Sequence, residues 1–80
     1  MQYSRFMKAI TKRLRLLRVD RGISQRDTAI KADLPYGRYM DIENAYRTPN
    51  NSEVARIARA LKASPADIVP SAEPEAAVAR

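Results

Sequence analysis

The stretch from Gly22 to Glu43, with the sequence GISQRDTAIKADLPYGRYMDIE, limits the possible folds of this chain more than any other. Gly22 suits the left-handed position that ends a helix, and Ser24 with Asp27 is a variant of the capping box that begins one. The apolar residues that follow are spaced to lie on facing sides of two helices: Ala29, Ala32, Leu34, Tyr39 and Ile42. The stretch therefore predicts two short helices, about residues 24–32 and 35–43, joined by a tight turn.

The second of these helices is expected to turn a mixed polar face outward, and this face consists of Tyr36, Gly37, Arg38, Met40 and Asp41. A short helix held against a supporting helix is a shape that enters the major groove of DNA. The helix is not itself basic, because Arg38 is offset by Asp41 and Glu43. Attraction to DNA is therefore expected from the segments that flank it.

Three further helices are predicted around this pair. An apolar stripe repeated at intervals of four, four and three residues predicts a first helix from about residue 4 or 5 to residue 20: Phe6, Ile10, Leu14 and Leu17. Asn50 with Glu53 is a start signal for a helix over about 51–62, and Ser64 followed by Pro65 begins a short last one. The predicted class is all-α, with five helices in one domain over residues 1–70.

From residue 71 the composition changes to alanine, glutamate and proline without a capping signal. Residues 71–80 are therefore interpreted as a disordered C-terminal tail.

The charge is uneven along the chain, which has a net charge of +6. Residues 1–31 hold nine basic and two acidic side chains, and so account for a local charge of +7. A positive field of this kind suits an anionic partner such as nucleic acid, although a solvated basic surface is the simpler alternative.

The composition excludes several classes of function. The chain has no cysteine and no histidine, so it lacks thiolate metal ligands and the commonest general base. No catalytic constellation appears, and neither an enzyme nor a cofactor or metal site is expected. No apolar stretch approaches a membrane span of about 18 residues, and no signal peptide is seen, so we expect a cytoplasmic protein. Binding of the first helix to a membrane surface is a weak alternative, because its apolar stripe is needed for the core.

An ordered series of short motifs runs from about Ile10 to Val69: LRLLR, GISQ, IEN, the turn at Pro49, VARIARAL and SPADI. In these residues the chain resembles the Cro/C1-type (XRE-like) helix-turn-helix family of bacterial and phage transcriptional regulators. The resemblance implies a lambda-repressor-like DNA-binding domain, with the helix-turn-helix proper at about 24–43. It also implies a homodimer on an inverted-repeat operator.

The resemblance further implies roles for individual residues. Gln25, at the first turn of its helix, would contact the DNA backbone, and the loop with Asn44 and Arg47 would lie along it. Asn44 alternatively only ends the helix in a left-handed conformation. Arg18 and Glu43 would form a partly buried ion pair, the alternative being that both point to water.

The remaining candidate contacts follow from side-chain chemistry. Arg38 is expected to bind guanine or a phosphate, and Tyr36 a thymine methyl or a phosphate. Gly37 either allows close approach to the duplex or is merely tolerated. Asp41 either accepts a hydrogen bond from cytosine N4 or, as we favour, orients Arg38. Met40 either touches DNA or covers the edge of the helix.

Arg26 and Lys31 are expected as phosphate clamps, which position a protein without reading sequence. Solvated surface charge is an equal alternative for Lys31.

Four residues depart from the family pattern. Asp33 replaces a usual glycine in the turn, and Pro35 replaces a capping serine or threonine. Thr28 and Tyr39 replace larger or branched aliphatic residues, so Tyr39 must bury its ring and find a partner for its hydroxyl. These departures put the geometry of the second short helix in question.

The sequence thus predicts a sequence-specific, double-stranded DNA-binding regulator, either a repressor or an autoregulator. Phage repressors, restriction-modification controllers and antitoxins all fit. The dimer contact is expected at Leu61, Ala63, Ile68 and Val69, unless that apolar surface is internal. A protein-interaction module, such as an antitoxin or a polymerase-contacting adaptor, is the alternative, with a toxin or RNA polymerase as the partner.

Overall fold

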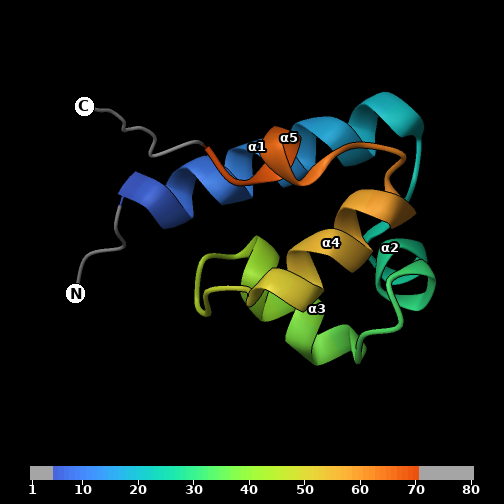
Figure 1. Ribbon diagram of the computed structural model, residues 1–80. Helices are drawn as coiled ribbons and strands as arrows, with labels where there is room; N and C mark the ends of the chain where they lie inside the picture. The colour runs from blue at the N-terminus through green and yellow to red at the C-terminus, as the bar shows by residue number, and fades with distance from the viewer. Residues whose placement is uncertain (1–4, 71–80) are drawn as a thin grey trace.

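The computed structural model describes residues 5–70, which form five helices and no strand (Figure 1). The helices are α1 (Arg5–Arg21), α2 (Gln25–Lys31), α3 (Tyr36–Glu43), α4 (Asn51–Ala60) and α5 (Pro65–Ile68). The predicted all-α class with five helices is confirmed. The tail predicted at residues 71–80 lies outside the described residues.

The helices form two groups. The long helix α1 lies along one side of the molecule with the short α5 beside it, and α2, α3 and α4 are grouped against them (Figure 1). α3 packs against both α1 and α2, and α4 packs against both α2 and α5. α3 is thus supported from two sides, and Tyr36 and Gly37 at its start stay exposed.

The starts of the helices follow the capping signals in the sequence. Ser24 Oγ accepts a hydrogen bond from the Asp27 N–H at 3.0 Å. Asn50 and Glu53 form a complete capping box, each side chain accepting from the other's backbone N–H at 2.8 and 2.9 Å. Pro35 begins α3 without a side-chain cap, as its chemistry predicts.

Left-handed backbone marks the ends of the helices. Gly22 has a φ of 66° and Asp33 a φ of 57°, which agrees with the conformations predicted for both positions. α4 ends two residues before the predicted position 62, because Lys62 has a φ of 54°. The left-handed residue after α3 is Ala45, with a φ of 67°, and not Asn44, so the prediction of a left-handed Asn44 was wrong.

A single core joins the five helices. It collects the inward stripe of α1, the facing sides of α2 and α3, and the buried faces of α4 and α5: Ile10, Leu14, Ala29, Ala32, Tyr39, Ile42, Val54, Ile57, Ala58, Ala60, Leu61 and Ile68. Phe6, at the start of the predicted α1 stripe, is instead 41% exposed. Each buried large aliphatic side chain contributes about 1.5–3 kcal/mol to folding. The position of α3 is therefore fixed by its packing in the core and not by the intrinsic stability of so short a helix.

Within residues 5–70, no helix has both the length and the apolar character needed to cross a lipid bilayer.

Candidate nucleic-acid interface

The turn between α2 and α3 is fixed by backbone hydrogen bonds. The N–H of Asp33 donates to the carbonyl of Ile30 at 3.0 Å, and the N–H of Leu34 donates to the carbonyl of Ala29 at 2.9 Å. This pairing with a left-handed residue at the end of a helix is the Schellman type of ending. The aspartate performs here the role that glycine usually has, so the orientation of α3 relative to α2 is fixed.

Glu43, at the end of α3, is the centre of a buried polar network. Its side chain has no exposed surface, and its two oxygens accept from Arg18 Nε at 2.7 Å and Nη2 at 2.8 Å. Tyr39 Oη donates to Oε1 at 2.6 Å, and Gln25 Nε2 donates to Oε2 at 2.8 Å. The network therefore ties α1, α2 and α3 to one carboxylate.

The pKa of Glu43 reflects two opposed causes. Burial alone raises the pKa of a carboxyl group, but the hydrogen bonds from Arg18, Tyr39 and Gln25 together hold the pKa of Glu43 below its usual value. Burial, and then the hydrogen bond to Glu43, raises the pKa of Tyr39. The phenol therefore stays protonated and donates to a charged carboxylate, which answers how Tyr39 satisfies its hydroxyl in the core.

Gln25 lies at the first position of α2, where the sequence predicts a phosphate contact. One N–H of its amide is used by Glu43, and an amide nitrogen carries two. The side chain is held at the edge of the helix pair with one donor left over. The structure thus fixes its orientation, and its contact with DNA stays a prediction.

The side chain of Arg38 is engaged within the protein, so its predicted contact with guanine or a phosphate stays a prediction. Its Nε and Nη2 donate to the two carboxylate oxygens of Glu53 at 2.7 and 2.6 Å, and Nη2 also reaches the carbonyl of Thr48 at 3.4 Å. The hydrogen bond from Arg38 lowers the pKa of Glu53, and the pKa of Arg38 is raised in turn. The same fork that would bind guanine is occupied within the protein, and Arg38 instead joins α3 to α4.

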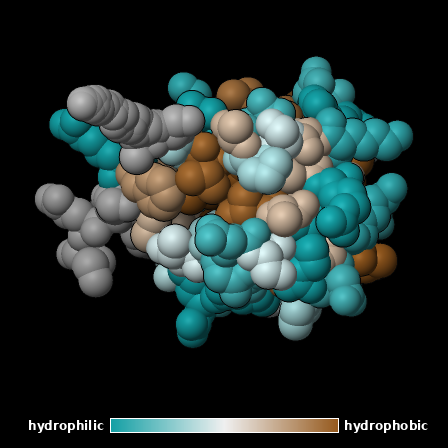
Figure 2. All heavy atoms as spheres, in the orientation of Figure 1, coloured by the Kyte–Doolittle hydropathy of each residue, from teal (hydrophilic) through white to brown (hydrophobic). Residues whose placement is uncertain are grey.

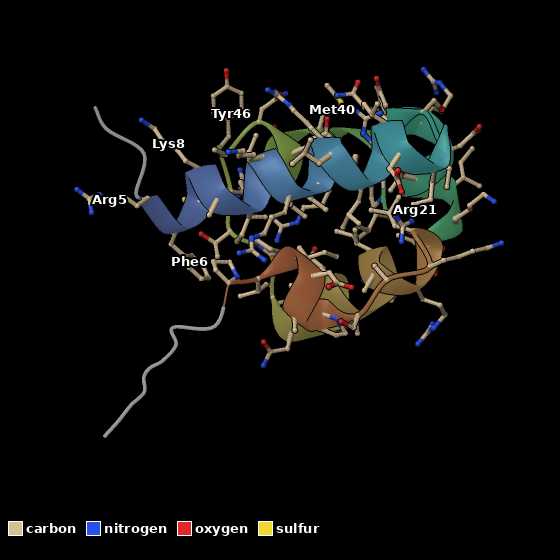
Figure 3. The ribbon with its side chains drawn as sticks, turned by 90° about the horizontal axis from the view of Figure 1, so that it is seen from above. Arg5, Phe6, Lys8, Arg21, Met40 and Tyr46 are labelled. Atoms are coloured by element: carbon tan, nitrogen blue, oxygen red, sulfur yellow. The ribbon has the colours of Figure 1, made fainter. Side chains whose placement is uncertain are left out.

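The rest of the outward face of α3 is accessible. Tyr36 is 39% exposed, and Gly37 is exposed with no atom within 4 Å of an added Cβ. Packing inside the protein therefore does not require glycine at position 37. Gly37 either allows close approach to the duplex or is merely tolerated, and both interpretations stay open. Met40 is half-buried and projects from the same side of the molecule as Lys8 and Tyr46 (Figure 3).

Asp41 pairs with a different arginine from the one we favoured. Its Oδ2 accepts from Arg47 Nε at 3.2 Å, so it orients the loop after α3 and not Arg38. Asn44 Oδ1 accepts from Arg15 Nη2 at 3.0 Å, so the loop is also joined to α1. The loop residues predicted to follow the DNA backbone are thus held by α1 and α3.

An open groove lies between α1 and this loop. Its volume is about 410 Å³, and it is lined by Lys8, Thr11, Lys12, Arg15, Leu16, Asn44 and Ala45. Three of these side chains are basic, so a positive surface runs from the loop after α3 towards the start of α1. The charge distribution along the sequence predicted that residues 1–31 are basic, but not that part of this charge lies beside the loop after α3.

A second pairing that the sequence did not reveal joins the helix-turn-helix itself. The Arg26 guanidinium of α2 lies 4.5 Å from the centroid of the Tyr36 ring of α3. The two residues are ten positions apart and share no helical periodicity. Arg26 and Lys31 were both predicted as phosphate clamps. Both side chains are exposed on α2, and their contacts with phosphate stay predictions.

The predicted dimer contact is corrected in part. Leu61 and Ile68 are 0% and 1% exposed within one chain, so they belong to its own core and cannot present apolar surface to a partner. Ala63 and Val69 are half-buried. Part of the surface over α4 and α5 is apolar (Figure 2), and Phe6 points to the α5 side of α1 (Figure 3).

Among residues 5–70, no group of three or more histidine, cysteine, aspartate or glutamate side chains is arranged to hold a metal ion.

Comparison with known proteins identifies the domain. Residues 9–69 match the sequence family described as a helix-turn-helix domain. No curated protein sequence matches the chain significantly.

Solved structures show the same architecture. The restriction-modification controller protein C.AhdI from Aeromonas hydrophila is 26% identical, with a TM-score of 0.74 over 78% of this chain and 94% of that chain. The clp gene regulator ClgR from Corynebacterium glutamicum is 25% identical, with a TM-score of 0.75 over 84% and 71% of the two chains. A hypothetical transcription factor, NHTF from Neisseria, shares the fold at 19% identity, with a TM-score of 0.77 over 86% and 83%.

Proposed function

The chain belongs to the helix-turn-helix family of DNA-binding transcriptional regulators, and from this premise we propose that it is a repressor or autoregulator that places α3 in the major groove of its operator. The observation that carries the proposal is the buried Glu43 network, which holds α3 against α1 and α2 while Tyr36 and Gly37 stay exposed. A short helix presented in this way is what the major groove admits.

The charges of the domain support contact with the DNA backbone on both sides of α3. Arg26 and Gln25 lie on the α2 side, and Arg47 lies on the other side in the loop. The basic groove of α1 continues this surface beyond the loop. Phosphate contacts from these flanks compensate for the acidic residues of α3, whose own charge is not positive.

We place the whole function in residues 1–70 as one domain and assign it no enzymatic activity, cofactor or metal. A cytoplasmic location follows from a role on the genome.

We further propose a homodimer on an inverted repeat, with half-sites about one helical turn apart. After the correction above, the contact is assigned to the α5 side of the molecule, with Ala63, Val69 and the exposed ring of Phe6. Sedimentation of wild type and Phe6→Glu checks this assignment, because a charge in that contact is expected to shift the protein towards monomer. An unchanged sedimentation coefficient would place the contact elsewhere.

Selection of bound sequences from random duplexes at defined salt tests the function. A palindromic consensus is expected, together with an affinity that falls steeply with salt, since each phosphate neutralised contributes about −0.9 to the slope of log K against log salt. Absence of any consensus combined with a flat salt dependence would instead favour the protein-interaction alternative.

A further inference from the structure

Arg26 and Tyr36 form an exposed stacked pair at the junction of the two helices of the helix-turn-helix. The guanidinium lies 4.5 Å from the ring centroid, well within the range of about 6 Å for a cation–π contact. Arg26 is exposed and Tyr36 is 39% exposed. The pair therefore stands at the surface, at the end of α3 that is nearest to α2.

Arg26 is also the arginine of this region whose N–H groups the protein itself leaves unused. Within residues 5–70, Arg38 donates to both oxygens of Glu53, Arg47 donates to Asp41, and neither hydrogen bond nor ion pair engages Arg26. The ring covers one face of the guanidinium but not the edges that carry its five N–H donors. Those edges are available to a ligand.

We infer that Arg26, held against the ring of Tyr36, reads a guanine in the operator, in place of Arg38. This inference rests on the proposed function, since it assumes that α3 enters the major groove. A planar fork matches guanine O6 and N7 with two parallel hydrogen bonds, and this is the commonest specific contact of arginine with DNA. Arg26 thereby changes from a residue that only positions the protein to one that determines specificity.

The stack is the reason for assigning a base rather than a phosphate. A phosphate can accept the arginine fork from several directions and also binds lysine as a point charge, whereas guanine O6 and N7 accept a fork only from the side of the groove. Contact with the ring of the first residue of α3 holds the guanidinium beside the helix that is proposed to enter the groove. It also restricts the long side chain before binding, so less freedom is lost when the two hydrogen bonds form. Tyr36 is thus a positioning residue for Arg26.

The test compares the consensus sequences selected by full-length wild type, Arg26→Lys and Tyr36→Leu, with Arg59→Lys, at an exposed arginine of α4, as the matched control. Arg26→Lys keeps the charge, so affinity for random duplex and the salt slope are expected to stay the same. Preference for guanine at one position of each half-site is expected to fall by about tenfold, the effect of losing one bidentate contact. Tyr36→Leu is expected to weaken the preference for guanine at the same position, and Arg59→Lys is expected to leave the preference unchanged at every position.

A chemical probe separates base reading from folding. Replacing the selected guanine by 7-deazaguanine removes one acceptor, so wild type is expected to lose several-fold in affinity and Arg26→Lys to lose little more. If Arg26→Lys selects the wild-type consensus and Arg26→Ala only lowers the salt slope by about one for every sequence, Arg26 is a phosphate clamp and the inference is overturned. If wild type itself selects no consensus, the proposed function fails together with it.

Discussion

Glu43 and Glu53 each accept two hydrogen bonds from one arginine guanidinium, but the two ion pairs lie in different surroundings. Glu43 is fully buried and has donors from three helices. Glu53 is 7% exposed in its side chain, its partner Arg38 is 28% exposed, and its remaining hydrogen bond belongs to the cap of α4. The comparison shows that equal geometry does not imply equal importance, since burial and the number of donors decide the cost of losing a carboxylate.

The largest effect is expected from Glu43→Ala, because it leaves Arg18 partly buried without a counter-charge. Removing one partner of a buried pair costs about 3–5 kcal/mol, which is a large part of the stability of a domain of this size. Urea denaturation followed by circular dichroism measures the loss. Glu53→Ala is the matched control and is expected to cost about 1–2 kcal/mol, from a lost cap and a half-exposed pair. Equal losses in the two variants would contradict the comparison.

Acid is expected to lower the stability of the fold by protonating Glu43 and Glu53. The loss is expected to be smaller than that caused by Glu43→Ala, because a protonated carboxyl group still accepts hydrogen bonds. The folded-state pKa of each carboxyl is lowered from the ordinary 4.5. The stability that each contributes is therefore complete above about pH 4.5 and is lost as pH falls through the folded value. Urea midpoints measured between pH 7 and pH 3 are expected to fall in wild type. A Glu43→Gln variant that falls just as steeply would mean that Glu43 does not contribute to the slope.

Tyr39→Phe sharpens the comparison by removing one donor from Glu43 without changing volume. Hydrogen bonds to charged groups contribute about 1.5–3 kcal/mol, and the expected loss lies near the lower end because Arg18 and Gln25 remain. The same variant is expected to weaken DNA binding slightly, through a less fixed α3. Urea denaturation measures the loss of stability. Ser52→Ala, which removes an exposed hydroxyl from α4, serves as the control and is expected to fall within about 0.5 kcal/mol of wild type.

Arg38→Ala is expected to have the smallest effect on stability, about 1 kcal/mol, because the Arg38 side chain is partly exposed and Glu53 keeps its hydrogen bond from the Asn50 N–H. The interest of this variant lies in its DNA binding. Because the guanidinium of Arg38 is bound to Glu53, Arg38→Ala is expected to leave the selected consensus unchanged. The variant is expected to lower the affinity for all sequences by a similar factor. A consensus altered at one base pair in Arg38→Ala would show that Arg38 leaves Glu53 when DNA binds.

The sequence was sufficient where the cause is local or periodic. Gly22, Ser24, Asn50 and Pro65 begin or end helices through their own chemistry, and the apolar spacing of α4 allowed its buried face to be predicted correctly. The main error in helix boundaries, at the end of α4, came from a left-handed Lys62 that no propensity rule favours. The family resemblance added the expectation of an Arg18–Glu43 pair, whose two bonds the structure describes.

Only the tertiary structure decided which arginine of the helix-turn-helix region has no hydrogen-bond partner within residues 5–70. Arg26, Arg38 and Arg47 are equivalent in charge, and no rule of spacing says that Arg38 would meet Glu53, 15 residues away, or that Arg26 would lie on Tyr36. The sequence likewise predicted Leu61 and Ile68 as part of an apolar dimer contact. The packing of α4 against α5 instead places both side chains in the core. Helices and caps are set by interactions within about four residues, so a sequence records them directly. The pairing of long charged side chains depends on how the helices pack, which is settled only when the core has formed.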